Sequence, residues 1–207
     1  MNLNFKLYLI TDRKLCQESS LEEIVRQALA AGIKAVQLRE KDLNTRELFE
    51  TGKNLKNLTD EYQSKLFIND RLDLLLSLDA AGIQIPEDGI PISQIKSHAA
   101  GKQIGASVHS IDKALAKEQE GADFLLFGPV FETESKKGIL EPQGLSNLSE
   151  VAASVKVPVL AVGGITPERA EKCLQHGAAG AAVISAILKS KNIPQTISEF
   201  KHALGEL

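Results

Sequence analysis

Eight short apolar runs divide the chain at intervals of roughly 20 to 30 residues, and most of them precede a longer segment with helical periodicity. A strand followed by a helix returns the chain to a parallel neighbouring strand, so this alternation strongly restricts the fold. The runs predicted as strands are Lys6–Ile10, Lys34–Leu38, Lys65–Ile68, Gly82–Ile85, Gln103–Ser107, Asp123–Phe127, Pro158–Val162 and Gly180–Ile184.

Capping residues mark the helical segments between these runs. Ser19 or Ser20 begins the first helix, and Gly32 follows its end, where a glycine suits a left-handed residue. Further helices are predicted to begin after Asn44 or Thr45 and near Ser110, Ser146, Thr166 and Ile193.

Eight strand–helix units in 207 residues lie near the lower size limit of the (β/α)8 barrel. We therefore predict an α/β protein with a single (β/α)8 TIM barrel, one domain over residues 1–207. An open doubly wound sheet is the alternative, but it would need a glycine-rich turn after the first strand, where the chain reads LITDRK.

Composition excludes several classes of protein. Hydrophobic residues make up 43% and charged residues 25%, the usual mixture of a globular protein. The net charge of -3 gives no general attraction to nucleic acid or anionic lipid. Two cysteines are too few for a disulfide framework, and no apolar run is long enough to span a bilayer. We expect a cytoplasmic protein without nucleic-acid or membrane partners, and the sequence allows a homodimer.

Active sites of this fold lie at the C-terminal ends of the strands, and every predicted strand here ends in polar residues or glycine. Gly163 and Gly164 follow the seventh strand, and Ser185 follows the eighth, where this fold binds phosphate through backbone N–H groups. Arg39 and Lys41 mark a second anion site. The cations predicted at this rim are Arg13, Arg39, Lys41, Arg71, Lys136 and Lys137.

Three acids near the same strand ends, Asp70, Asp73 and Asp88, offer oxygen ligands for Mg²⁺ bound to a pyrophosphate. Each candidate also has a structural alternative. Arg39 and Lys41 could pair with Glu40 and Asp42, and Asp73 could pair with Arg71. Asn69 and Asp70 could cap the next helix, and His109 could bond its own loop. Glu87 and Asp88 could be loop residues that bind no ligand.

Seven motifs in order carry a resemblance to a known family: LYLITDR, VQLREKD, FINDRLDLLL, GASVHS, FGPVF followed by SKKG, PVLAVGGIT and AAVISAI. Together they resemble the thiamine phosphate synthase / thiazole tautomerase superfamily, a group of (β/α)8 barrels in thiamine biosynthesis. The synthase branch implies small phosphorylated substrates. It condenses hydroxymethylpyrimidine pyrophosphate with thiazole phosphate carboxylate to thiamine phosphate and pyrophosphate. The pyrophosphate leaves in a dissociative step, which requires Mg²⁺ and fixed cations more than acid or base.

The resemblance also implies roles for individual residues. Gln37, Arg39 and Lys41 would contact the pyrimidine and the pyrophosphate, Asn69 the pyrophosphate, and Ser107 the pyrimidine. Thr133, Ser135, Gly164, Ile184 and Ser185 would surround the thiazole phosphate, Lys136 would reach the pyrophosphate, and His109 would contact substrate. Arg39, Lys41, Ser107 and Lys136 are the predicted catalytic residues, and Asp70 and Asp88 the predicted metal ligands.

Two departures from the family patterns keep two other functions open. The synthase pattern after the fourth strand is His-Leu-Gly-Gln-Glu-Asp, whereas this chain has Gly89 at the Asp position and Asp88 one residue earlier. A tautomerase usually carries an acid/base histidine where this chain has Pro129. The alternatives are a cofactor-free thiazole tautomerase-like isomerase and a catalytically silent regulator that binds thiazole or thiamine phosphate.

Overall fold

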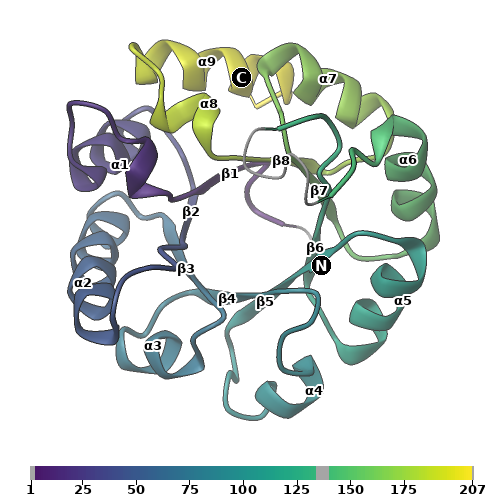
Figure 1. Ribbon diagram of the computed structural model, residues 1–207, viewed down its shortest axis with the longest axis horizontal. Coiled ribbons are helices and arrows are strands. Elements are labelled where there is room, and N and C mark those ends of the chain that lie inside the picture. The colour runs from purple at the N-terminus through teal and green to yellow at the C-terminus, as the bar shows by residue number, and fades with distance from the viewer. Residues whose placement is uncertain (1–2, 134–139, 207) are drawn as a thin grey trace.

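Eight parallel strands close into a barrel with helices around the outside (Figure 1). The computed structural model describes residues 3–133 and 140–206. Neighbouring strands pair in chain order, and β8 pairs with β1. The strands are β1 (Leu7–Ile10), β2 (Ala35–Leu38), β3 (Lys65–Asn69), β4 (Gly82–Ile85), β5 (Gln103–Val108), β6 (Phe124–Phe127), β7 (Val159–Val162) and β8 (Gly180–Val183). The predicted fold class is confirmed, and each strand begins and ends within one residue of its prediction.

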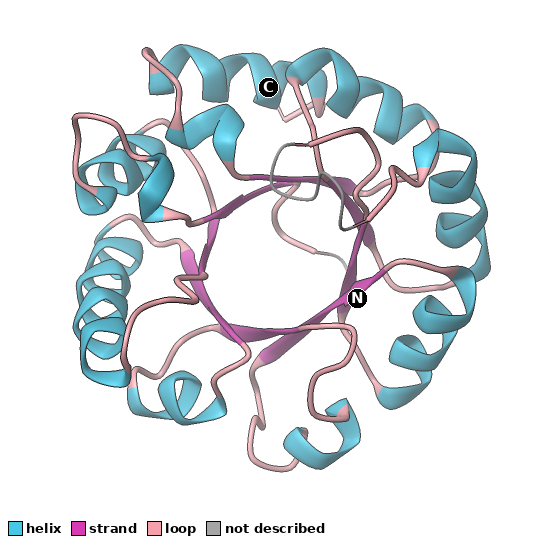
Figure 2. Ribbon diagram, viewed as in Figure 1, coloured by secondary structure: helices cyan, strands magenta, loops and turns pink. Residues whose placement is uncertain are grey.

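Helices form a ring outside the strands, as Figure 2 shows. They are the 3-10 helix η1 (Arg13–Leu15) and the helices α1 (Leu21–Ala30), α2 (Thr45–Glu61), α3 (Leu72–Ser77), α4 (Ile92–Ile95), α5 (Ile111–Glu120), α6 (Gly144–Ser154), α7 (Pro167–Gln175), α8 (Ser185–Leu188) and α9 (Ile193–Ala203). None of the helices in the described ranges is long and apolar enough to cross a membrane.

The capping residues act as predicted. Ser20 and Ser110 each accept a hydrogen bond from the backbone of their helix, and Asn44 forms a reciprocal capping box with Glu47. The sequence prediction placed the start of α6 near Ser146, two residues too late. It named α3 only as the helix that Asn69 and Asp70 could cap, and it did not predict α4 or α8. These three helices have six residues or fewer, too few for a helical period to show in the sequence.

Two hydrophobic cores stabilise the barrel, one between strands and helices and one inside the ring of strands. The inner core contains four aromatic side chains, Phe5, Tyr8, Phe67 and Phe124, whose ring centroids lie 5.3 to 5.9 Å apart. Such edge and stacked contacts are favourable for aromatic rings. The aromatic group therefore fills the barrel below the C-terminal mouth.

Glycines on β4 and β5 make room for these rings. A Cβ added at Gly82 would lie 2.5 Å from Phe67 Cε1, and one added at Gly105 would lie 2.4 Å from Phe124 Cζ. Because both distances are far below van der Waals contact, no larger residue fits without displacing a ring.

The next inward layer, at the mouth, is divided into a polar half and an apolar half. Side chains alternate along a strand, so the positions two residues beyond the aromatic layer also face inward. From β2 to β5 these positions hold Gln37, Asn69, Gln84 and Ser107, whereas β6, β7, β8 and β1 supply Leu126, Val162, Ala182 and Ile10. The register thus gathers the polar strand ends on one side of the mouth.

We predict that Gly105→Ala lowers the free energy of unfolding by about 1–3 kcal/mol, because its methyl group overlaps the Phe124 ring and the Gln84 amide. In a Phe124→Leu background, Gly105→Ala should lower the free energy of unfolding by a smaller amount, because leucine has no ring edge for the new methyl group to overlap. Urea denaturation of the four proteins measures this coupling. Equal costs in both backgrounds would contradict the packing argument.

Candidate active site

Two pairs of side chains connect the polar half of the mouth. Gln37 Nε2 donates to Asn69 Oδ1 at 3.1 Å, and Gln84 Nε2 donates to Ser107 Oγ at 3.2 Å. Both glutamines are buried, with 1% of their surface exposed. Within the described part of the chain, their Oε1 atoms accept no hydrogen bond. An unsatisfied buried carbonyl costs about 1–3 kcal/mol, so these oxygens suit a ligand or water that donates hydrogen bonds.

Ion pairs separate the rim cations into two groups. Arg13 Nη1 lies 3.1 Å from Glu40 Oε2 and 2.6 Å from Asp42 Oδ1, and Lys14 also pairs with Asp42. These contacts hold the pKa of Asp42 well below its usual range. Among the described residues Arg39 forms no ion pair, so the alternative in which it pairs with Glu40 and Asp42 is wrong. Two residues beyond Gln37, Arg39 carries an unneutralised charge at the mouth.

Asp70 lies directly after β3 in a left-handed backbone conformation, with φ of 57°. Its N–H donates to Gln84 O at 3.0 Å, which fixes the turn between β3 and β4. Partial burial raises the pKa of Asp70, and the charge of Lys41 opposes that shift. Lys41 and Asp70 therefore share one electrostatic environment at the mouth.

The capping alternative for Asn69 and Asp70 is wrong, because Arg71 is the N-cap of α3 and no side chain caps that helix. The alternative for Asp73 is confirmed, since Arg71 Nε donates to its Oδ1 at 2.8 Å. This pair removes Arg71 from the unpaired cations of the rim.

The two predicted metal ligands are both exposed but differ in their surroundings. Partial desolvation raises the pKa of Asp70 beside the mouth, whereas the Asp88 side chain is 89% exposed and lies 3.6 Å from Lys113 Nζ. Within residues 3–133 and 140–206, no three His, Cys, Asp or Glu side chains form a group that could hold a metal. Mg²⁺ commonly binds through one or two carboxylates and substrate phosphates, so Asp70 fits such an ion together with a pyrophosphate.

His109 is hydrogen-bonded within the protein, as its structural alternative proposed, but to the loop after β4 and not to its own loop. Its backbone N–H and its Nδ1 lie 2.8 and 2.9 Å from Glu87 Oε2. Contact of His109 with substrate stays a prediction. Pro129, at the tautomerase histidine position, is buried and offers no group that transfers a proton.

The predicted phosphate site consists of the turn after β7 and the start of α8. Gly163 and Gly164 have φ of 97° and 63°, and a Cβ at Gly164 would lie 2.5 Å from Glu132 O. Only glycine fits this close approach. Ile184 is the N-cap of α8 and Ser185 its first residue, so the unpaired N–H groups of its first turn lie beside the β8 end. Ser135, Lys136 and Lys137 lie outside the described residues.

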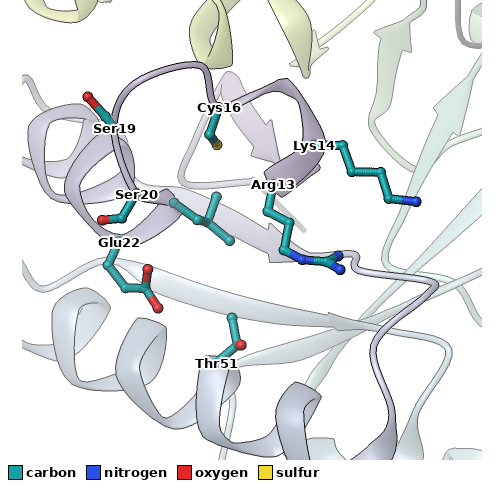
Figure 3. Close-up of a pocket in the computed structure, with 8 residues that line it drawn as sticks. Arg13, Lys14, Cys16, Ser19, Ser20, Glu22 and Thr51 are labelled. Carbon is teal, nitrogen blue, oxygen red and sulfur yellow. The ribbon is translucent and has the colours of Figure 1, made fainter.

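A cavity of about 410 Å³ lies beside this rim, between η1, the start of α1, and α2 (Figure 3). It is lined by Arg13, Lys14, Cys16, Ser19, Ser20, Leu21, Glu22 and Thr51. The two cations on its wall are already paired with acids, and burial and nearby acids raise the pKa of the Cys16 thiol. The cavity therefore offers neither an unpaired cation to bind an anion nor an activated thiol.

The predicted site residues did not include Gln84 and Arg169, which the structure places beside them. Gln84 was visible at the fourth strand end, since it is a polar residue inside the apolar run GIQI, as Gln37 is in AVQL, but it received no role. Arg169 had no such signal, because it is one of several charged residues in a helix. It donates from Nη1 to Gly164 O at 2.6 Å.

Residues 7–187 match the family model described as thiamine monophosphate synthase. The chain belongs to the thiamine monophosphate synthase family. It is 42% identical over 209 residues to thiamine-phosphate synthase of Pyrococcus furiosus, covering 100% of this chain and 99% of that relative. A relative from Clostridium acetobutylicum with the same name is 39% identical and covers 93% of this chain and 91% of its own length.

Solved structures show the same relationship. Thiamine phosphate pyrophosphorylase from Pyrococcus furiosus aligns with a TM-score of 0.87 at 41% identity, over 98% of this chain and 96% of that one. A thiamine phosphate pyrophosphorylase from Bacteroides thetaiotaomicron aligns with a TM-score of 0.71 over 97% of this chain and 98% of that one, and at 15% identity it supports the fold alone. Membership of the thiamine monophosphate synthase family confirms the resemblance seen in the motifs.

We predict that Asp70→Asn stabilises the ligand-free protein. The substitution removes a desolvated charge, and asparagine tolerates a positive φ. Because the folded pKa of Asp70 lies above its unfolded value, the wild type loses stability as pH rises through this interval. The increase in melting temperature caused by Asp70→Asn should therefore be largest at pH values above the folded pKa of Asp70 and smaller at pH values below its unfolded pKa. Thermal melts across pH would measure this increase.

Asp73→Asn is the matched control, and we expect it to have the opposite effect on the stability of the folded protein. Arg71 lowers the pKa of Asp73, so this carboxylate stabilises the folded state above its unfolded pKa. Its replacement should lower the melting temperature at neutral pH or leave it unchanged. A loss of stability in Asp70→Asn would contradict the assignment of Asp70 as a strained, desolvated acid.

Proposed function

We propose that this protein is a thiamine phosphate synthase. It would join hydroxymethylpyrimidine pyrophosphate to thiazole phosphate carboxylate, releasing pyrophosphate and, from the carboxylated thiazole, CO₂. The observation that carries the proposal is the arrangement of the mouth. Lys41 and an unpaired Arg39 follow β2, Asp70 follows β3, and the Gly163–Gly164 turn follows β7. One barrel mouth thus offers separate sites for two anionic groups.

The proposed reaction needs charge stabilisation more than proton transfer. As the bond to the pyrophosphate breaks, negative charge grows on the leaving group, and Arg39 and Lys41 would stabilise it. Lys136 would act in the same way. Asn69 would donate to a pyrophosphate oxygen through its amide N–H₂, because Gln37 occupies its Oδ1.

The two halves of the mouth would do different work. Gln37 and Ser107 would orient the pyrimidine on the polar half. Leu126, Val162 and Ile10 on the apolar half would exclude water, which would otherwise capture the pyrimidine cation. Holding the thiazole nitrogen against that cation then directs the bond that forms.

Asp70 would hold Mg²⁺ together with pyrophosphate oxygens, and Asp88 could join only by leaving Lys113. Bound Mg²⁺ would neutralise part of the pyrophosphate charge as a Lewis acid. Gly164, Ser185 and Ile184 would surround the thiazole phosphate, with Thr133 and Ser135 from the loop after β6. His109 would contact substrate from its place beside Glu87.

We predict Mg²⁺-dependent pyrophosphate release when both substrates are mixed with the protein. Asp70→Asn should lower kcat at least about 100-fold, because the carboxylate that holds the metal is lost. Binding of thiazole phosphate, measured by calorimetry, should be unchanged. Asp73→Asn, a neighbouring acid already paired with Arg71, should retain kcat within about threefold.

The same experiment separates the other two functions. No pyrophosphate release at high protein concentration would refute the synthase proposal. Metal-independent exchange of a substrate proton with solvent would then support the tautomerase-like isomerase. Binding of thiazole phosphate without turnover of either substrate set would support a regulator.

A further inference from the structure

We propose that Arg169 is a positioning residue that fixes the backbone of the phosphate site in its binding conformation. The inference rests on the proposed function only for the identity of the ligand, a thiazole phosphate. It concerns the turn after β7, where Gly163 and Gly164 both have positive φ. Arg169 itself lies in the first turn of α7, five residues after Gly164.

Two contacts attach the Arg169 side chain to this turn and to the segment after β6. Its Nη1 donates to Gly164 O at 2.6 Å, and its guanidinium carbon lies 4.7 Å from the centroid of the Phe131 ring. The second distance is that of a cation–π contact. Arg169 therefore holds together the glycine turn and the segment that leads to Thr133.

Both carbonyls of the glycine turn are occupied. Phe131 N–H donates to Gly163 O at 3.2 Å, and Arg169 occupies Gly164 O. In a trans peptide the N–H points opposite to the C=O. The N–H groups of Gly164 and Ile165 therefore point away from Phe131 and Arg169.

These two N–H groups have no acceptor anywhere in residues 3–133 and 140–206. Ile165 is 5% exposed and Gly164 is partly buried, so solvent has limited access to this backbone. Successive free N–H groups in a turn form a concave site for an anion. Gly164 C=O and Ile165 N–H belong to one peptide group. By holding Gly164 O, Arg169 fixes the direction of the Ile165 N–H.

The positive charge of Arg169 is also available to an anion. Within the described ranges its guanidinium lies within 4.0 Å of no carboxylate, unlike Arg13 and Arg71, which are paired. The planar guanidinium can donate to a carbonyl while its face rests on an aromatic ring. A lysine at this position could reach the carbonyl but would lack the planar face.

The test compares Arg169→Ala, Arg169→Lys and the control Lys172→Ala, an exposed cation on the same helix. Calorimetry would measure binding of thiazole phosphate and of inorganic phosphate, and steady-state assays would measure KM for each substrate. We expect Arg169→Ala to weaken binding of both phosphates and to raise the KM for thiazole phosphate about tenfold. The KM for the pyrimidine pyrophosphate should stay within twofold, Arg169→Lys should recover part of the loss, and Lys172→Ala should match the wild type.

Unchanged thiazole phosphate binding in Arg169→Ala would overturn the proposal, as would an equal rise in both KM values. If Arg169→Ala melts at a much lower temperature, Arg169→Lys decides. Binding between that of the wild type and that of Arg169→Ala in a stable Lys variant supports the planar contact, and wild-type binding overturns it. The calorimetry needs no turnover. Selective loss of phosphate binding in a protein that releases no pyrophosphate would therefore support the role of Arg169 while refuting the synthase activity.

Discussion

Closure of the eight-stranded parallel sheet is the constraint on which the rest of the molecule depends. Once β8 pairs with β1, every second side chain must fit inside a ring of fixed size. Phe67 and Phe124 fill that space because Gly82 and Gly105 leave it open. The aromatic layer in turn fills the barrel, so the next inward layer lies at the C-terminal ends of the strands.

The division of this layer into polar and apolar halves makes the proposed chemistry physically reasonable. A cation formed by loss of pyrophosphate needs anion stabilisation on one side and exclusion of water on the other. Strands β2 to β5 supply the buried amides of Gln37 and Gln84 and the half-buried Asn69 and Ser107, and strands β6 to β8 and β1 supply apolar side chains. Within the described residues the buried Oε1 atoms of Gln37 and Gln84 accept no hydrogen bond, so a ligand that donates one there would be stabilised.

Local pairing decides which charges are available in a protein whose net charge is -3. Glu40 and Asp42 neutralise Arg13, and Asp73 neutralises Arg71, so these cations fix loops. Arg39 and Arg169 have no such partner in the described chain and lie at the two proposed anion sites. Electrostatic attraction of a phosphorylated ligand would therefore be local, as expected when the field of the whole protein is weakly repulsive.

Much of the fold followed from the sequence, because strand alternation and helix caps are local properties. The apolar runs located all eight strands, and Ser20, Asn44, Ser110 and Thr166 began the helices where they were predicted. Glycines after β7 and cations after β2 marked the two candidate anion sites for the same reason. Pairing across the barrel was decided only by the tertiary structure. The sequence could not show that Glu40 binds Arg13 in place of Arg39, that Gln84 lies against Ser107, or that Arg169 reaches Gly164, because these contacts depend on register and loop geometry, which join residues from different units of the chain.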